Sequence, residues 1–140
     1  MSLTGRTIAV LAGEGYQELE LWYPVLRARE AGADVAVVTS VPTGVTSHLG
    51  YPLIPVGQDA EPSVFDAVVV AGTVTGVPAL SDAQAALLRA AEADAKPIYT
   101  IGTATEVAAS GARRFASADA LPELMRALVS ELSEKSDLSE

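Results

Sequence analysis

Four short runs of apolar, largely β-branched residues constrain the fold of this chain more than any other feature. The runs are TIAVLAG at 7–13, DVAVVTS at 34–40, FDAVVVAG at 65–72 and PIYTIG at 97–102. Each run is apolar on both faces, which is typical of a strand buried between layers of helices. Strands alternating with helices predict an α/β fold, a three-layer α/β/α sandwich with a mainly parallel sheet. The stretch 50–57, punctuated by Gly and Pro, suits an edge strand or an arm.

Two connecting helices are indicated by spacing and by capping residues. Ser81 followed by Gln84 forms a capping box, in which each side chain bonds the other residue's backbone, and predicts a helix over 82–94. Apolar residues recurring at helical spacing predict another helix over 16–31, with Trp22 in the core. The members of that apolar stripe are Leu19, Trp22, Val25 and Leu26, widened by Leu21 and Ala28.

Two more helix signals stand in the last third of the chain. Thr103 and Glu106 form a second capping box, so a helix is expected to begin directly after Gly102. Asp119 is expected to cap a final helix that runs to about Leu132. The bend between the fourth strand and the helix expected after it, residues 102–105, is called the elbow below.

The composition limits the chemistry and the partners. A chain of 140 residues that is 49% hydrophobic suits one domain, expected over 1–132, with a frayed polar tail at 133–140. The net charge of -9 disfavours nucleic acids and anionic membrane surfaces, because both attract Lys and Arg. The absence of cysteine excludes disulfides and thiolate chemistry. With no signal peptide and no run of about 18 apolar residues, a cytoplasmic protein is expected.

Ligands of parallel α/β folds bind at the carboxyl ends of the strands, which points to the turns 13–17, 71–76 and 102–105. None of these turns carries a familiar cofactor motif. Glu18 stands where a dinucleotide fingerprint needs its third glycine, and no GxxxxGK[ST] phosphate loop occurs. His48 is the only histidine and is expected to be a loop residue. No metal site and no cofactor are therefore predicted.

Taken together, the three turns resemble those of a known family. The segments LAGEGYQELELWYPVLRAREAGADVAVVT, FDAVVVAGT and KPIYTIGTATEVAASG are similar, in order and spacing, to the ThiJ/PfpI superfamily over roughly residues 5–112. The resemblance implies a flavodoxin-like sandwich of the class I glutamine amidotransferase type. The short C-terminal part and the cysteine-free elbow are also similar to the C-terminal domains of large-subunit catalases.

Carried over residue by residue, the resemblance implies a pocket at the elbow. Glu20 matches the family's glutamate that hydrogen-bonds a reactive cysteine, and Gly72 and Thr73 lie in the turn that supplies backbone N–H donors. Gly102 stands in the position of the cysteine, and Thr103 follows it. The family's hydrolase, glyoxalase and deglycase activities pass through the thiolate, so no catalytic residue is predicted here.

Several of these residues have two interpretations. On a helical wheel Glu20 falls with Arg27 and Glu30, which suits a solvated face, whereas the resemblance implies a pocket. Gly102 suits either a bend that demands positive φ or a clearance left for a ligand. Tyr23 suits ordinary packing or a dimer interface.

Two classes of function remain open. We expect a catalytically silent domain that binds a small anionic ligand at the elbow, binds a partner, or assembles as a homodimer. The alternative is a cysteine-independent hydrolase or glyoxalase-like enzyme with Glu20 as general base. In that enzyme the N–H groups at 72–74 and 103–105, beside Glu20, would receive an anion or oxyanion. A buried Glu20 aimed at Gly102 would have a raised pKa suited to a base, and an exposed one would not.

Overall fold

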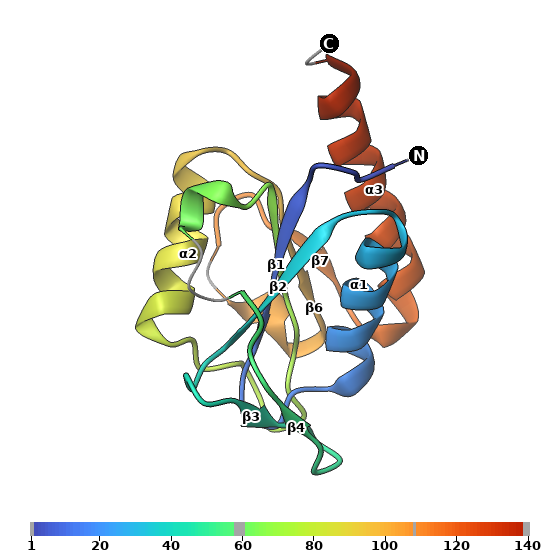
Figure 1. Ribbon diagram of the computed structural model, residues 1–140. Helices are drawn as coiled ribbons and strands as arrows, with labels where there is room; N and C mark the ends of the chain where they lie inside the picture. Colours follow the sequence, from blue (N-terminus) through green and yellow to red (C-terminus); the bar gives the residue numbers. More distant parts are fainter. Residues whose placement is uncertain (1, 58–60, 108, 139–140) are drawn as a thin grey trace.

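A parallel five-stranded sheet forms the centre of the computed structural model, which describes residues 2–57, 61–107 and 109–138 (Figure 1). Its strands are β1 (Thr7–Ala12), β2 (Asp34–Thr39), β5 (Ala67–Val70), β6 (Ile98–Ile101) and β7 (Arg113–Phe115). They lie in the order β2-β1-β5-β6-β7, which is the flavodoxin-like arrangement when the five are counted along the chain. The predicted fold class and the four predicted strands are confirmed.

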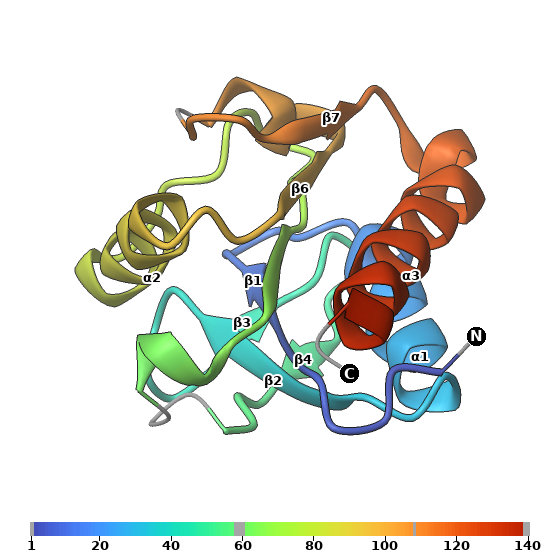
Figure 2. The same ribbon diagram turned by 90° about the horizontal axis from the view of Figure 1, so that it is seen from above.

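Helices cover both faces of this sheet (Figure 2). Helices α1 (Glu18–Glu30) and α3 (Leu121–Leu138) lie on one face, and α2 (Asp82–Ala93) lies on the other. Successive strand residues point to opposite faces, so Tyr99 packs with the α1 and α3 side chains and Ile98 packs with those of α2. Each face therefore has its own buried apolar core, and the strand ends are left for the turns that form the site.

The capping box that begins α2 is present as predicted. Gln84 N–H donates to Ser81 Oγ at 3.1 Å, and Ser81 N–H donates to Gln84 Oε1 at 3.1 Å. The Gln84 amide also donates to the carbonyls of Ala12 and Val38, at 3.1 and 2.9 Å. This buried side chain thus ties the start of α2 to the carboxyl ends of β1 and β2.

Helix α1 buries a different stripe from the one the spacing predicted. Its buried apolar side chains are those of Leu21, Pro24, Val25 and Ala28. Leu19 is 59% exposed, Leu26 is 56% exposed, and Trp22 is half-buried at the edge of the core. The apolar residues of α1 cover more of the helix surface than one buried stripe needs. The side of α1 that packs against the sheet and α3 is the one that becomes buried, and Leu19 and Leu26 lie outside it. Because the buried stripe is rotated, Glu20 points inward in the first turn.

A short antiparallel pair forms an arm beside the sheet. Strands β3 (Val45–Thr46) and β4 (Pro52–Leu53) pair with each other, and the chain beyond them returns to the sheet, where Val56 pairs with Val37 of the edge strand β2. The stretch 50–57 was predicted as an edge strand or an arm. It contains β4, which belongs to the arm, and Val56, which pairs with the edge of the sheet.

Strand β7 was not predicted, because its side chains do not look like those of a buried strand. Arg113 and Arg114 are exposed at this edge of the sheet. The strand is held by Glu131 of α3, which accepts hydrogen bonds from the Tyr99 hydroxyl at 2.5 Å and from the Arg113 guanidinium at 3.1 and 2.7 Å. One carboxylate thus joins β6, β7 and α3.

Helix α3 differs from the prediction at both ends. A 3-10 turn at Ala118–Ala120 precedes it, so Asp119 lies inside that turn and does not cap the helix. The helix continues to Leu138 instead of ending near Leu132, because the polar residues expected to fray include good helix formers and no Gly or Pro. Residues 139–140 of the predicted tail lie outside the described residues. No helix in the described part of the chain is long and apolar enough to cross a membrane.

Candidate functional site

Three turns meet at the carboxyl end of the sheet, as predicted. Gln17 N–H, after β1, donates to the carbonyl of Gly72, after β5, at 2.9 Å. Thr73 N–H donates to Oγ1 of Thr103 at 2.8 Å, and that hydroxyl donates to the Thr73 carbonyl at 3.0 Å. These contacts and the ones below bring together all five residues of the predicted pocket: Glu20, Gly72, Thr73, Gly102 and Thr103.

Glu20 turns its carboxyl group toward the strand ends. The first turn of α1 is capped by Gln17, whose side-chain oxygen accepts a hydrogen bond from Glu20 N–H at 2.9 Å. Glu20 is only 7% exposed, and its Oε1 accepts a hydrogen bond from Gly72 N–H at 3.0 Å. The structure therefore places Glu20 in the interior and not on the solvated face that the helical wheel suggested.

Gly102 lies directly against this carboxyl group. Its φ is +61°, a left-handed conformation that glycine adopts without strain. A Cβ added here would lie 2.7 Å from Oε2 and 2.8 Å from Oε1 of Glu20. Gly102 thus meets both a backbone requirement and a requirement for space. The carboxyl group of Glu20 occupies that space, where the sequence had suggested room for a ligand.

The elbow is not followed by the predicted α-helix. Residues Gly102–Glu106 form a single 3-10 turn without a side-chain cap, and Val107 returns to extended backbone. The predicted capping box is wrong, because the Thr103 hydroxyl is bound to the backbone of Thr73. A turn this short lacks the aligned peptide dipoles of an α-helix, so the positive helix end expected to attract an anion is missing.

The electrostatics of the site centre on Glu20. Burial raises the pKa of the Glu20 carboxyl above its ordinary value, while the Gly72 N–H donor and the positive potential of His48 act in the opposite direction. His48 lies in the loop beside the arm, as predicted, with Nδ1 3.3 Å from the Tyr16 carbonyl. Within the described residues, no group of three or more His, Cys, Asp or Glu side chains could hold a metal ion.

The sequence reasoning missed Tyr16 as an organising residue of the site. Tyr16 is fully buried, and its backbone forms bridges with Ser47 near the arm and with Thr73 in the turn after β5. Ser47 Oγ in turn donates to the Glu18 carboxylate at 2.5 Å. The sequence did contain a signal for this role. Tyr16 is an aromatic residue in the turn between β1 and α1, and a large apolar ring in a turn indicates that the turn packs against the rest of the protein.

Chemically, this arrangement holds one carboxyl group against backbone atoms. Gly102 offers no side chain, and the neighbouring Thr103 hydroxyl both donates to and accepts from Thr73. The Thr105 hydroxyl donates to the Gly102 carbonyl at 2.8 Å, so both hydroxyls of the described elbow are engaged with the backbone. The ionisable group that lies against the elbow is the Glu20 carboxyl.

Comparison with known proteins identifies the family. A family model described as the DJ-1/PfpI family matches residues 6–131. The chain belongs to the DJ-1/PfpI family. This confirms the resemblance to the ThiJ/PfpI superfamily that the three turns had indicated.

Three proteins similar to this DJ-1/PfpI chain share between 16% and 29% sequence identity with it. A deglycase of Thermococcus kodakarensis is 29% identical over 97 residues, which are 67% of this chain and 58% of that protein. The chain thus spans little more than half the length of this curated relative.

Among solved structures, Drosophila melanogaster DJ-1beta has a TM-score of 0.74 at 19% identity, and the match covers 94% of this chain and 91% of that one. Oxidized Toxoplasma gondii DJ-1 has a TM-score of 0.72 at 16% identity, with coverages of 93% and 95%. At these identities the two structures show the shared fold alone.

Proposed function

We propose that this member of the DJ-1/PfpI family is a catalytically silent domain that serves as a binding or assembly module. The observation that carries the proposal is the content of the elbow. Gly102 stands where the family resemblance places the nucleophilic cysteine, and the Glu20 carboxyl fills the space that a side chain there would enter. In this proposal the elbow keeps the scaffold of the family and lacks its reactive atom.

The missing thiolate removes the chemistry that the family resemblance implies. A nucleophile needs a side-chain atom and, in most sites, a neighbouring base that activates it. The Thr103 hydroxyl is bound to Thr73, the Thr105 hydroxyl donates to the Gly102 carbonyl, and the ring of His48 faces the Tyr16 carbonyl. In this proposal the chain lacks the deglycase activity for which the Thermococcus kodakarensis relative is named.

A second function is supported by the raised pKa of Glu20, since a buried carboxylate with a raised pKa is suited to proton abstraction. It would make the chain a cysteine-independent hydrolase or glyoxalase-like enzyme. The burial of Glu20 and its bond to Gly72 N–H disfavour this alternative, because a substrate must first displace that contact. A small anionic ligand at the elbow would meet the same obstacle.

Assembly as a homodimer remains part of the proposal. Two leucines on the outer face of α1, Leu19 and Leu26, are exposed, and so are Leu49 and Tyr51 on the arm. Leu19 and Leu26, seven positions apart, lie on the same side of α1, and association between two copies would bury exposed apolar side chains of this kind. The proposal also includes the resemblance to the C-terminal domains of large-subunit catalases, which rests on the short C-terminal part and the cysteine-free elbow of the sequence. Sedimentation velocity measures the oligomeric state directly.

The activity assay follows from the missing nucleophile. We expect the purified protein to consume methylglyoxal no faster than buffer, and Glu20→Ala to behave like the wild type, measured as aldehyde loss and lactate formation. Turnover that survives further purification and disappears in Glu20→Ala would overturn the proposal and establish the Glu20-dependent alternative.

A further inference from the structure

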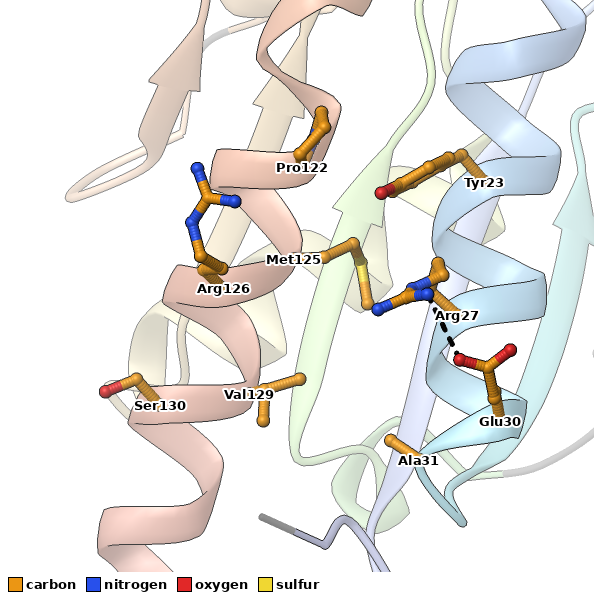
Figure 3. A pocket seen from close by; sticks show the side chains of 9 residues that line it. All are labelled: Tyr23, Arg27, Glu30, Ala31, Pro122, Met125, Arg126, Val129 and Ser130. Carbon is orange, nitrogen blue, oxygen red and sulfur yellow. Dashed lines mark ion pairs between the residues drawn. The ribbon is translucent and has the colours of Figure 1, made fainter.

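A groove separates the two helices on one face of the sheet, away from the elbow. Figure 3 shows α1 and α3 side by side, with Tyr23 opposite Pro122 at one end of the groove. At the other end, Ala31 lies directly after α1 and Ser130 lies on α3. The groove has a volume of about 590 Å³, which is within the range of small-molecule sites, roughly 300–1,000 Å³. From Tyr23 to Ala31 it runs for about 12 Å, at 1.5 Å per helical residue.

The surface of the groove is mostly apolar. Met125, which is buried, and Val129 line the α3 side, and the ring of Tyr23 lines the α1 side. The remaining apolar residues of the groove are Ala31 and Pro122. A site with this lining binds the hydrocarbon part of a ligand, and its few polar groups set the orientation.

The polar groups of the groove favour an anion. Two arginines line the groove, Arg27 from α1 and Arg126 from α3, against the single carboxylate of Glu30. This local excess of positive charge is unusual in a chain with a net charge of -9. Guanidinium groups bind carboxylates through paired, charge-assisted hydrogen bonds.

Both arginines are available to a ligand. Arg27 pairs with Glu30 at 3.1 Å, but both side chains are exposed, and an exposed pair of this kind contributes little stability and is readily exchanged. Figure 3 shows Arg27 extending across the groove toward Met125. Within the part of the chain that the structure describes, Arg126 forms no ion pair.

We propose that the groove between α1 and α3 binds a linear amphipathic carboxylate. The hydrocarbon chain lies along Tyr23, Met125 and Val129, and the carboxylate is held by Arg27 and Arg126. This site is separate from the elbow, so it stands whether or not the elbow is catalytically silent.

Titration with sodium octanoate, below the concentration at which it forms micelles, tests the proposal. We expect saturable shifts of the backbone amide signals of Tyr23 and Val129 in NMR spectra of the labelled protein. Octanol and octylamine serve as neutral and cationic probes of the same length, and they should bind more weakly. Equal binding of all three probes, or no saturation with octanoate, would overturn the proposal.

Matched variants identify the anion contact. Arg27→Gln combined with Arg126→Gln should weaken octanoate binding about tenfold or more, because a hydrogen bond to a charged group is lost at each position. Arg89→Gln makes the same change on the exposed face of α2 and should leave the affinity unchanged. Equal affinities in the double variant and the Arg89→Gln control would contradict the assignment.

Sedimentation velocity in the same solutions separates a ligand site from an interface. We expect octanoate to leave the sedimentation coefficient unchanged. The contrary result has two parts: octanoate dissociates a dimer, and the amides of Tyr23 and Val129 are protected from hydrogen exchange only in that dimer. The groove would then be occupied by a second copy of the chain, and the proposal fails.

Discussion

Gly102→Ala should lower the free energy of unfolding by about 3 kcal/mol, in two parts. A residue with a Cβ costs about 1–2 kcal/mol in the left-handed conformation that Gly102 adopts, with φ of +61°. The new Cβ would also lie 2.7 Å from Oε2 of Glu20, so the carboxyl must leave Gly72 N–H. Losing the partner of a buried polar group costs about 1–3 kcal/mol more. Urea unfolding measures the sum.

Two controls separate these parts. Gly111 has φ of +71° and no atom within 4 Å of an added Cβ, so Gly111→Ala should show the backbone cost alone. In a Glu20→Ala background, Gly102→Ala should likewise cost only about 1–2 kcal/mol. If Gly102→Ala costs no more than Gly111→Ala, and Glu20→Ala does not change that cost, the carboxyl does not lie against Gly102.

Gly72→Ala is expected to cost about 3 kcal/mol or more, for a different reason. An added Cβ would lie 2.6 Å from Oε1 of Glu20, 2.9 Å from the Ile101 carbonyl and 2.9 Å from the Thr103 hydroxyl. The Glu20 side chain can move, but the Ile101 carbonyl belongs to the backbone of β6 and cannot move without disturbing the sheet. Thermal and urea unfolding both report the loss.

Gly13→Ala is the matched control at the end of the neighbouring strand. Its added Cβ would be 3.7 Å from the nearest atom, the Ser40 hydroxyl, which is ordinary contact. We expect this variant to be close to wild type in stability. A Gly72→Ala protein as stable as Gly13→Ala would show that the turn after β5 is not packed against Glu20 and the elbow.

Local sequence patterns were sufficient to predict the sheet and one cap. Four runs rich in β-branched residues predict β1, β2, β5 and β6, because short runs of this composition that are apolar on both faces are typical of strands between two helix layers. The Ser81 and Gln84 pair predicts the start of α2 because both partners of the capping box are close in sequence. In these elements the local pattern agrees with the packing around it, and the prediction holds.

The elbow could not be predicted in the same way, since it depends on contacts between distant residues. The Thr103 hydroxyl that was expected to cap a helix binds Thr73, 30 positions away. The buried Glu20 carboxyl accepts a hydrogen bond from Gly72 N–H, 52 positions away in the sequence. A helical wheel contains no information about the turn in which Gly72 lies. Strand β7 depends on Glu131 of α3, which pairs with Arg113, and not on an apolar pattern.

The NMR titration of the Glu20 side-chain carboxyl carbon tests most directly whether this carboxyl fills the elbow. Because burial raises the pKa of Glu20, we expect it to titrate above the value of an ordinary glutamate. The amide of Gly72, which donates to the carboxyl, and the amide of Gly102, the residue beside it, should shift in the same step and should not respond in Glu20→Gln. An ordinary pKa for Glu20, with no response at Gly72 or Gly102, would contradict the account.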